Sequence, residues 1–76
     1  MTPKTPRLTS SEMVRAIEKM GFILRRQSGS HMIFKDVADK GVTIPYHAGR
    51  TLHPKVVASI LKDAGLSVDD LRRTNE

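Results

Sequence analysis

The sequence contains no cysteine and no tryptophan, and it has only one tyrosine and two phenylalanines. The absence of cysteine excludes disulfide bonds and thiolate metal sites. Small secreted domains usually depend on disulfide bonds, so we expect a cytoplasmic protein. The sequence also lacks an apolar run long enough to act as a signal peptide or to cross a bilayer. We therefore expect no membrane partner.

The length and charge of the chain limit what it can be. Its 76 residues allow one domain with a modest core, which we place at residues 9–76 after a flexible tail at residues 1–8. Thirteen Lys and Arg residues against eight Asp and Glu give a net charge of +5. Such a domain suits a polyanion, either nucleic acid or an acidic protein. Charge alone does not show that such a partner exists, because many small soluble domains are basic.

Two segments carry the pattern of amphipathic helices. The first begins at Thr9, which forms the T-x-x-E spacing of a capping box with Glu12, and it ends before Gly21. The second begins near Pro54 and stops at Gly65. A polar loop at residues 47–52 precedes it, and a short helical turn at residues 67–73 follows it. Both helices present apolar residues at helical spacing: Met13, Val14, Ile17 and Met20 in the first, and Val57, Ile60, Leu61 and Ala64 in the second.

Three short β-prone runs lie between the helices, at residues 22–27, 31–35 and 42–46. Ser28-Gly29 predicts a tight two-residue turn between the first two runs. This turn would pair Arg26 with His31 on one face of the sheet. Pro45 favours an edge position for the third run, since proline cannot donate to the ladder. The order predicts an α+β fold, α-β-β-β-α, whose three-stranded antiparallel sheet carries both helices on one face.

His31 is the candidate catalytic residue. It opens the second predicted strand directly after Gly29 and Ser30, and histidine is the side chain that exchanges a proton near neutral pH. Cutting RNA without a metal requires activation of the ribose 2′-hydroxyl, stabilisation of charge on the phosphate and protonation of the leaving oxygen. Histidine serves the first or third task, and arginine serves the second. The alternative is that His31 is an ordinary polar residue at the start of a strand.

Further polar residues are candidate RNA contacts. Arg25 and Arg26 suit phosphate, because a guanidinium binds it in a fork. Such a pair is also common on the solvated face of a strand. His47 and Arg50 flank Gly49 in the loop after the third strand, where they form either part of the same groove or a solvated loop. His47 is our candidate for a second acid or base.

Two other kinds of site are disfavoured by spacing. The three histidines are scattered at positions 31, 47 and 53, without zinc-type pairs or a neighbouring carboxylate cluster, so we expect no metal and no cofactor. His53 is better interpreted as a residue that flanks the second helix. Ser30 and His31 are neighbours on a strand and point to opposite faces, which argues against a serine hydrolase.

Four segments, taken in order, resemble the HicA family, the toxin halves of HicA/HicB toxin–antitoxin pairs. They are Gly21-Phe22, then Arg26 to His31 with Phe34, then Val42 to His47, and finally Ile60 to Ser67. The resemblance implies a fold similar to a double-stranded-RNA-binding domain and ribosome-independent cleavage of mRNA. It also implies that the histidine of the G-S-H triplet, His31 here, is catalytic. We expect Gly29 and Ser30, beside it, to be RNA contacts. A HicB-type antitoxin would cover the active face.

One segment departs from the family. Pro54 to Val57 stand where the family often has a Gly-Thr-Leu-like segment, so no RNA contact is carried over there. The leading interpretation is a metal-independent endoribonuclease that uses His31. The alternative is a non-catalytic RNA-binding module of the same fold, which binds by shape and phosphate contacts. An operator-DNA binder lacks support, because neither helix has a helix-turn-helix partner at short spacing.

Overall fold

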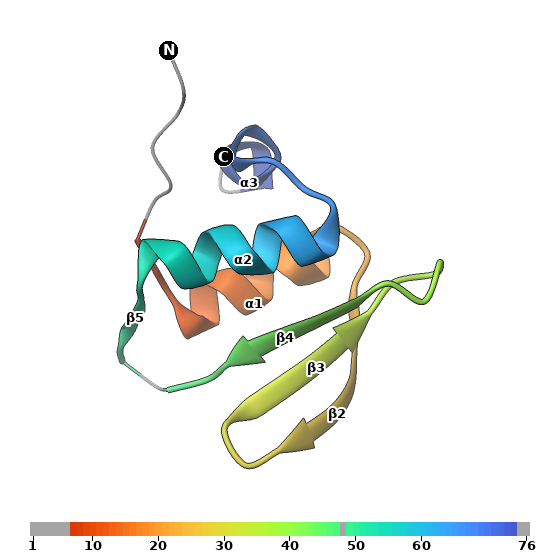
Figure 1. The fold of residues 1–76 in the computed structure, drawn as a ribbon, viewed down its shortest axis with the longest axis horizontal. Coiled ribbons are helices and arrows are strands. Elements are labelled where there is room, and N and C mark those ends of the chain that lie inside the picture. Colours follow the sequence, from red (N-terminus) through yellow and green to blue (C-terminus); the bar gives the residue numbers. More distant parts are fainter. Residues whose placement is uncertain (1–6, 48, 75–76) are drawn as a thin grey trace.

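The computed structural model describes residues 7–47 and 49–74, and Figure 1 shows how its elements follow one another. A short strand and a helix come first and a three-stranded sheet follows, before a second short strand and two helices. In chain order these elements are β1 (Leu8–Thr9), α1 (Ser10–Lys19), β2 (Ile23–Ser28), β3 (His31–Lys35), β4 (Gly41–Pro45), β5 (Thr51–Leu52), α2 (Pro54–Ala64) and α3 (Val68–Thr74).

The helices start and stop at the residues that the sequence indicates. Thr9 caps α1: its Oγ1 accepts from the Glu12 backbone N–H at 3.1 Å, and the Glu12 carboxylate accepts from the Thr9 N–H at 2.9 Å. These reciprocal bonds satisfy two amides that the first turn leaves without helical partners. Helix α2 has Pro54 at its start and ends at Gly65, which adopts a left-handed conformation with φ of 71°. The predicted helix ends are confirmed.

The three-stranded sheet has the antiparallel order β2-β3-β4. Phe34, Val42 and Ile44 are almost fully buried on one face, where they join the apolar stripes of α1 and α2 in one core. In Figure 1, β4 lies nearest the helices and β2 farthest from them. All residues of β2 are exposed. The predicted α+β architecture, with both helices against one face of the sheet, is confirmed.

The turn between β2 and β3 differs from the prediction. Ser28 pairs with His31, so the turn residues are Gly29 and Ser30, and Arg26 pairs with Ile33 instead of His31. The register shifts between Leu24 and Arg26, which identifies Arg25 as the extra residue of a bulge. Gly29 has φ of 58° and supplies the positive φ that this turn requires. The predicted pairing of Arg26 with His31 is therefore wrong.

A second, two-stranded sheet was not predicted. Leu8 in β1 pairs with Leu52 in β5, and both side chains are buried. Leu8 therefore belongs to the folded domain and not to the tail expected at residues 1–8, and residues 1–6 of that tail lie outside the described residues. The loop at residues 47–52, expected to be polar, contributes Leu52 to the core. Both strands have two residues, too few for an alternating pattern to reveal them.

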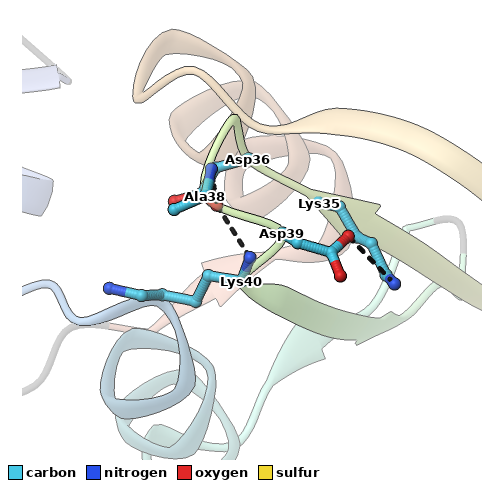
Figure 2. Close-up of polar contacts among 5 residues, drawn as sticks. All are labelled: Lys35, Asp36, Ala38, Asp39 and Lys40. Atoms are coloured by element: carbon cyan, nitrogen blue, oxygen red, sulfur yellow. Dashed lines mark hydrogen bonds and ion pairs between the residues drawn. The ribbon is translucent and has the colours of Figure 1, made fainter.

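The connection between β3 and β4 is a compact turn at the end of the sheet opposite the β2–β3 hairpin (Figure 2). The Asp36 carboxylate accepts from the backbone N–H groups of Ala38 at 3.0 Å and Lys40 at 2.8 Å. Lys35 and Asp39 form an ion pair with an N–O distance of 3.2 Å, and Asp39 has φ of 64°. Aspartate is among the residues that tolerate a positive φ in turns. This end of the sheet is fixed without any predicted site residue.

Candidate functional site

The candidate site lies at the end of the sheet formed by the β2–β3 turn and the end of β4. His31 is the first residue of β3 and is exposed. Its Cα partners are Ser28 on one side and Pro45 on the other. Side chains alternate along a strand, and Phe34 points into the core. His31 therefore lies on the face of the sheet opposite the helices.

Hydrogen bonds hold the segment after β4 against the hairpin and against α1. The Tyr46 N–H donates to the Ser30 carbonyl, and the His47 N–H donates to Ser10 Oγ at 3.2 Å. Ser10 Oγ in turn donates to the Pro45 carbonyl at 3.0 Å. Ser10 is only 1% exposed, so this bridge is protected from competing water. The arrangement places His47 at the same end of the sheet as His31.

Two arginines lie on β2 beside this end of the sheet. Arg26 pairs with Ile33, two residues after His31, so Arg26 and His31 lie on the same face as diagonal neighbours. Arg26 and His31 were predicted to share a face, and this part of the prediction is correct. The true partner of Arg26 lies two residues from the predicted one, and a shift by two residues keeps the side chains on the same face. Arg25 lies in the bulge, and both arginines are exposed. Neither side chain forms a hydrogen bond or ion pair with another residue of the described ranges 7–47 and 49–74, which leaves both available to an anion.

The loop after His47 carries the remaining predicted contacts. The Arg50 N–H donates to the His47 carbonyl at 3.1 Å, and Gly49 has φ of 76°, so this loop turns back on itself. Both His47 and Arg50 are exposed. His53 is not part of this group. Its Nδ1 accepts from the Lys55 N–H at 3.0 Å, which makes it the N-cap of α2, in agreement with its interpretation as a helix-flanking residue.

Two residues that organise this end of the sheet were missed in the sequence. Ser10 lies three residues before Met13 and seven before Ile17, on the buried stripe of α1. A hydroxyl at such a position predicts a hydrogen bond to another element, because a buried hydroxyl needs a partner. Tyr46 bonds Ser11 Oγ through its hydroxyl oxygen at 2.8 Å. The partners of both bonds are 35 residues apart in sequence, and local patterns do not reveal such pairs.

The two carboxyl groups with shifted pKa values serve helix ends and not this site. The Thr9 backbone N–H bond lowers the pKa of Glu12, and the Ser67 backbone N–H bond lowers the pKa of Asp70. No group of three or more His, Asp and Glu side chains suited to a metal ion occurs among residues 7–47 and 49–74. In the same ranges, no helix has the length and apolar character needed to cross a membrane.

Comparison with known proteins gives one family match. A family model described as the HicA toxin of bacterial toxin–antitoxin systems matches residues 10–66, well over half of the chain. The match begins at Ser10 and includes the hairpin, β4 and α2, so it contains every element that builds this end of the sheet. No curated protein matches the sequence.

Proposed function

We propose that this chain, which belongs to the HicA family of bacterial toxins, exerts its toxic effect by cutting mRNA. The proposed catalytic residue is His31. Family membership establishes the toxin role and supports a nuclease type of activity. The observation that carries the finer proposal is the position of His31. An exposed histidine opens β3 beside a glycine turn, on the same open face as Arg26. A net charge of +5 favours a polyanionic substrate.

The proposed reaction is attack of a ribose 2′-oxygen on the neighbouring phosphorus. The 2′-hydroxyl loses its proton to a base, the new O–P bond forms, and the bond to the 5′-oxygen breaks as that oxygen gains a proton. The products are a 2′,3′-cyclic phosphate and a 5′-hydroxyl. His31 performs one of the two proton transfers, and the Arg26 guanidinium stabilises the charge on the phosphate oxygens.

His47 is the proposed second acid or base. The Ser10 bridge and the bond from the Tyr46 N–H to the Ser30 carbonyl hold the backbone at His47 and directly before it. His31 pairs with Pro45, two residues before His47. Two histidines at one end of a sheet could supply the base and the acid that a metal-independent cleavage requires. Arg25 and Arg50, with the Gly29 and Ser30 backbone, are proposed RNA contacts around them.

The alternative function is RNA binding without cleavage. Binding by shape and phosphate contacts needs cations but no titratable group. The His31 side chain forms no hydrogen bond or ion pair with another residue of the described part of the chain, so its imidazole is open to a substrate. This observation favours the nuclease.

A toxin of this family implies an antitoxin partner, and we propose that a HicB-type antitoxin covers the face that carries His31. The exposed cations of β2 suit an acidic surface. Amide hydrogen exchange with and without the antitoxin tests this proposal. Protection is expected across residues 28–34. Protection confined to α3 would contradict it.

The decisive experiment is His31→Ala. Removal of one general acid or base typically slows a reaction by about 10²–10⁴-fold, while an exposed histidine contributes no more than about 0.5 kcal/mol to stability. The variant should remain folded, bind RNA and lose cleavage and toxicity. A melting curve, an RNA gel shift and a cleavage time course on one preparation separate these effects. A folded variant that cuts RNA at the wild-type rate would falsify the assignment of His31.

A further inference from the structure

A hollow of about 400 Å³ lies between α1 and the end of the β2–β3 hairpin, on the side of the sheet that faces the helices. Gln27 and its partner Met32 line it from the sheet, and Val14, Arg15 and Glu18 line it from α1. His31 lies on the opposite face of the same sheet end, next to Met32 in the chain. The hollow is therefore separate from the proposed site of proton transfer but adjacent to it.

The floor of the hollow is apolar and aromatic. Val14 and Met32 line it, and both are half-buried at the margin of the core. Tyr46 also lines it, held by its hydroxyl bond to Ser11 Oγ at 2.8 Å and by its N–H bond to Ser30. Unpaired bases in RNA complexes stack on such aromatic and apolar surfaces.

The rim of the hollow is polar and carries both signs of charge. Arg15 and Glu18, on successive turns of α1, and Gln27 on β2 complete its lining together with Ser11. All three are exposed and form no ion pair within the described residues. A nucleobase has flat apolar faces and an edge of hydrogen-bonding groups, which matches an apolar floor beneath a polar rim. An arginine suits the O6 and N7 acceptors of guanine, and a carboxylate accepts from amino and imino N–H groups.

We propose that this hollow is a subsite for one unpaired nucleobase, with guanine preferred, within one or two nucleotides of the bond that is cut. The inference rests on the proposed function, because it assigns the sequence preference of the RNA that the toxin would cut. A strand that crosses the Gly29–Ser30 turn can place a phosphate at His31 on one face and a base in the hollow on the other. Arg15 and Glu18 become the specificity-determining residues.

Tyr46 provides a direct readout, because it is the single tyrosine in a chain without tryptophan. A base stacked in the hollow should quench its fluorescence. We would titrate 2′-O-methyl pentamers, which cannot be cut by the 2′-hydroxyl route, comparing pentauridine with a pentamer that has one central guanine. The guanine pentamer should quench at a lower concentration. Arg15→Ala and Glu18→Ala should each weaken its binding by about tenfold.

Matched controls are Lys62→Ala and Asp63→Ala, which remove the same charges from exposed positions on α2. They should keep the preference for guanine. Equal quenching by both pentamers, or a preference that the rim variants leave unchanged, would overturn the subsite. Cleavage plays no part in the readout. A protein that shows guanine-dependent quenching but cuts no RNA therefore refutes only the proposed nuclease, and one that cuts RNA without base-dependent quenching refutes only the subsite.

Discussion

Strands β2 and β4 are the two edges of the same sheet, but they differ in what covers them. In β4, Val42 and Ile44 are buried under the helices, with 2% and 0% of their surfaces exposed. In β2, every residue is exposed, including Ile23 at 59% and Leu24 at 40%. Apolar burial is the main favourable term in folding. The comparison teaches that the buried residues of β4 contribute to the stability of the fold. The exposed residues of β2 contribute little to the core and can be substituted without loss of apolar burial.

The largest expected effect is on folding, from Phe34→Ala. Phe34 is fully buried, and truncation of a buried phenylalanine costs about 3–5 kcal/mol. A core of this size supplies roughly 3–5 kcal/mol in total, so most of the variant should be unfolded at 25 °C. Circular dichroism with urea titration measures this loss. Phe34 lies on β3 and pairs with Val42 of β4 on the buried face of the sheet. Ile23→Ala on exposed β2 is the control and should keep the wild-type midpoint, and a comparable loss in both variants would contradict the division between the buried face and β2.

The next largest effect is expected from a change at Ser10, because its hydroxyl connects α1 to the segment that carries His47. Ser10→Ala leaves the Pro45 carbonyl and the His47 N–H without their partner. A buried polar group left unsatisfied costs about 1–3 kcal/mol. Cleavage should also fall, because the segment that carries His47 loses an anchor. Thermal melting and a cleavage assay are compared with those of Ser59→Ala, an exposed serine on α2. A Ser10 variant with wild-type stability would disprove the bridge.

The architecture could be predicted from sequence because its signals are local. The capping box at Thr9 and Glu12 and the glycine at the end of α2 depend on neighbours within a few residues. The apolar stripes then determine which faces meet in the core. The turn was misplaced by one residue because Ser28-Gly29 and Gly29-Ser30 both offer glycine to a two-residue turn. The bulge at Arg25 shifts the pairing between Leu24 and Arg26, and nothing in the composition of β2 indicates it.

The candidate site was only partly predictable. His31 and Arg26 lie on paired strands, and a two-residue turn at either Ser28-Gly29 or Gly29-Ser30 places their side chains on one face. The contribution of α1 depends on contacts 35 residues apart in sequence, between Ser10 and Pro45 and between Ser11 and Tyr46. Such pairs follow from the tertiary packing of α1 over the end of β4, which no local pattern encodes.

A smaller effect is expected from Arg26→Ala, which tests whether β2 binds phosphate. For a single strand, each phosphate contact contributes about −0.7 to the slope of log affinity against log salt concentration. Three to five contacts predict a slope of roughly −2 to −3.5, and loss of one contact should make it shallower by about 0.7. Filter binding with a non-cleavable RNA measures the slope. Arg72→Ala removes the same charge from α3, far from the hairpin (Figure 1), and should leave the slope unchanged.

Identical slopes for the Arg26 and Arg72 variants would contradict a phosphate contact at Arg26. A wild-type affinity for RNA that stays constant between low and moderate salt would contradict any binding through phosphate contacts.

The smallest effect is expected at the start of α1 in acid. The Thr9 N–H bond lowers the pKa of Glu12, so the folded state favours the charged carboxylate. This contribution is complete above the carboxyl's ordinary pKa and disappears as the pH falls through the lowered value in the folded state. Glu12→Gln keeps an acceptor for Thr9 and removes the titration. Its melting temperature should therefore fall less than that of the wild type between pH 6 and pH 3, and an equal fall in both proteins would contradict this role of Glu12.

The open edge of β2 also bears on self-association. An edge strand with unpaired backbone groups and exposed Ile23 and Leu24 is a template for adding another strand. The bulge at Arg25 and the two adjacent positive charges are features that discourage such pairing in natural sheets. The cations proposed to hold phosphate would thus also keep separate copies of the protein apart. Replacing both with neutral residues should lower the concentration at which the protein begins to aggregate.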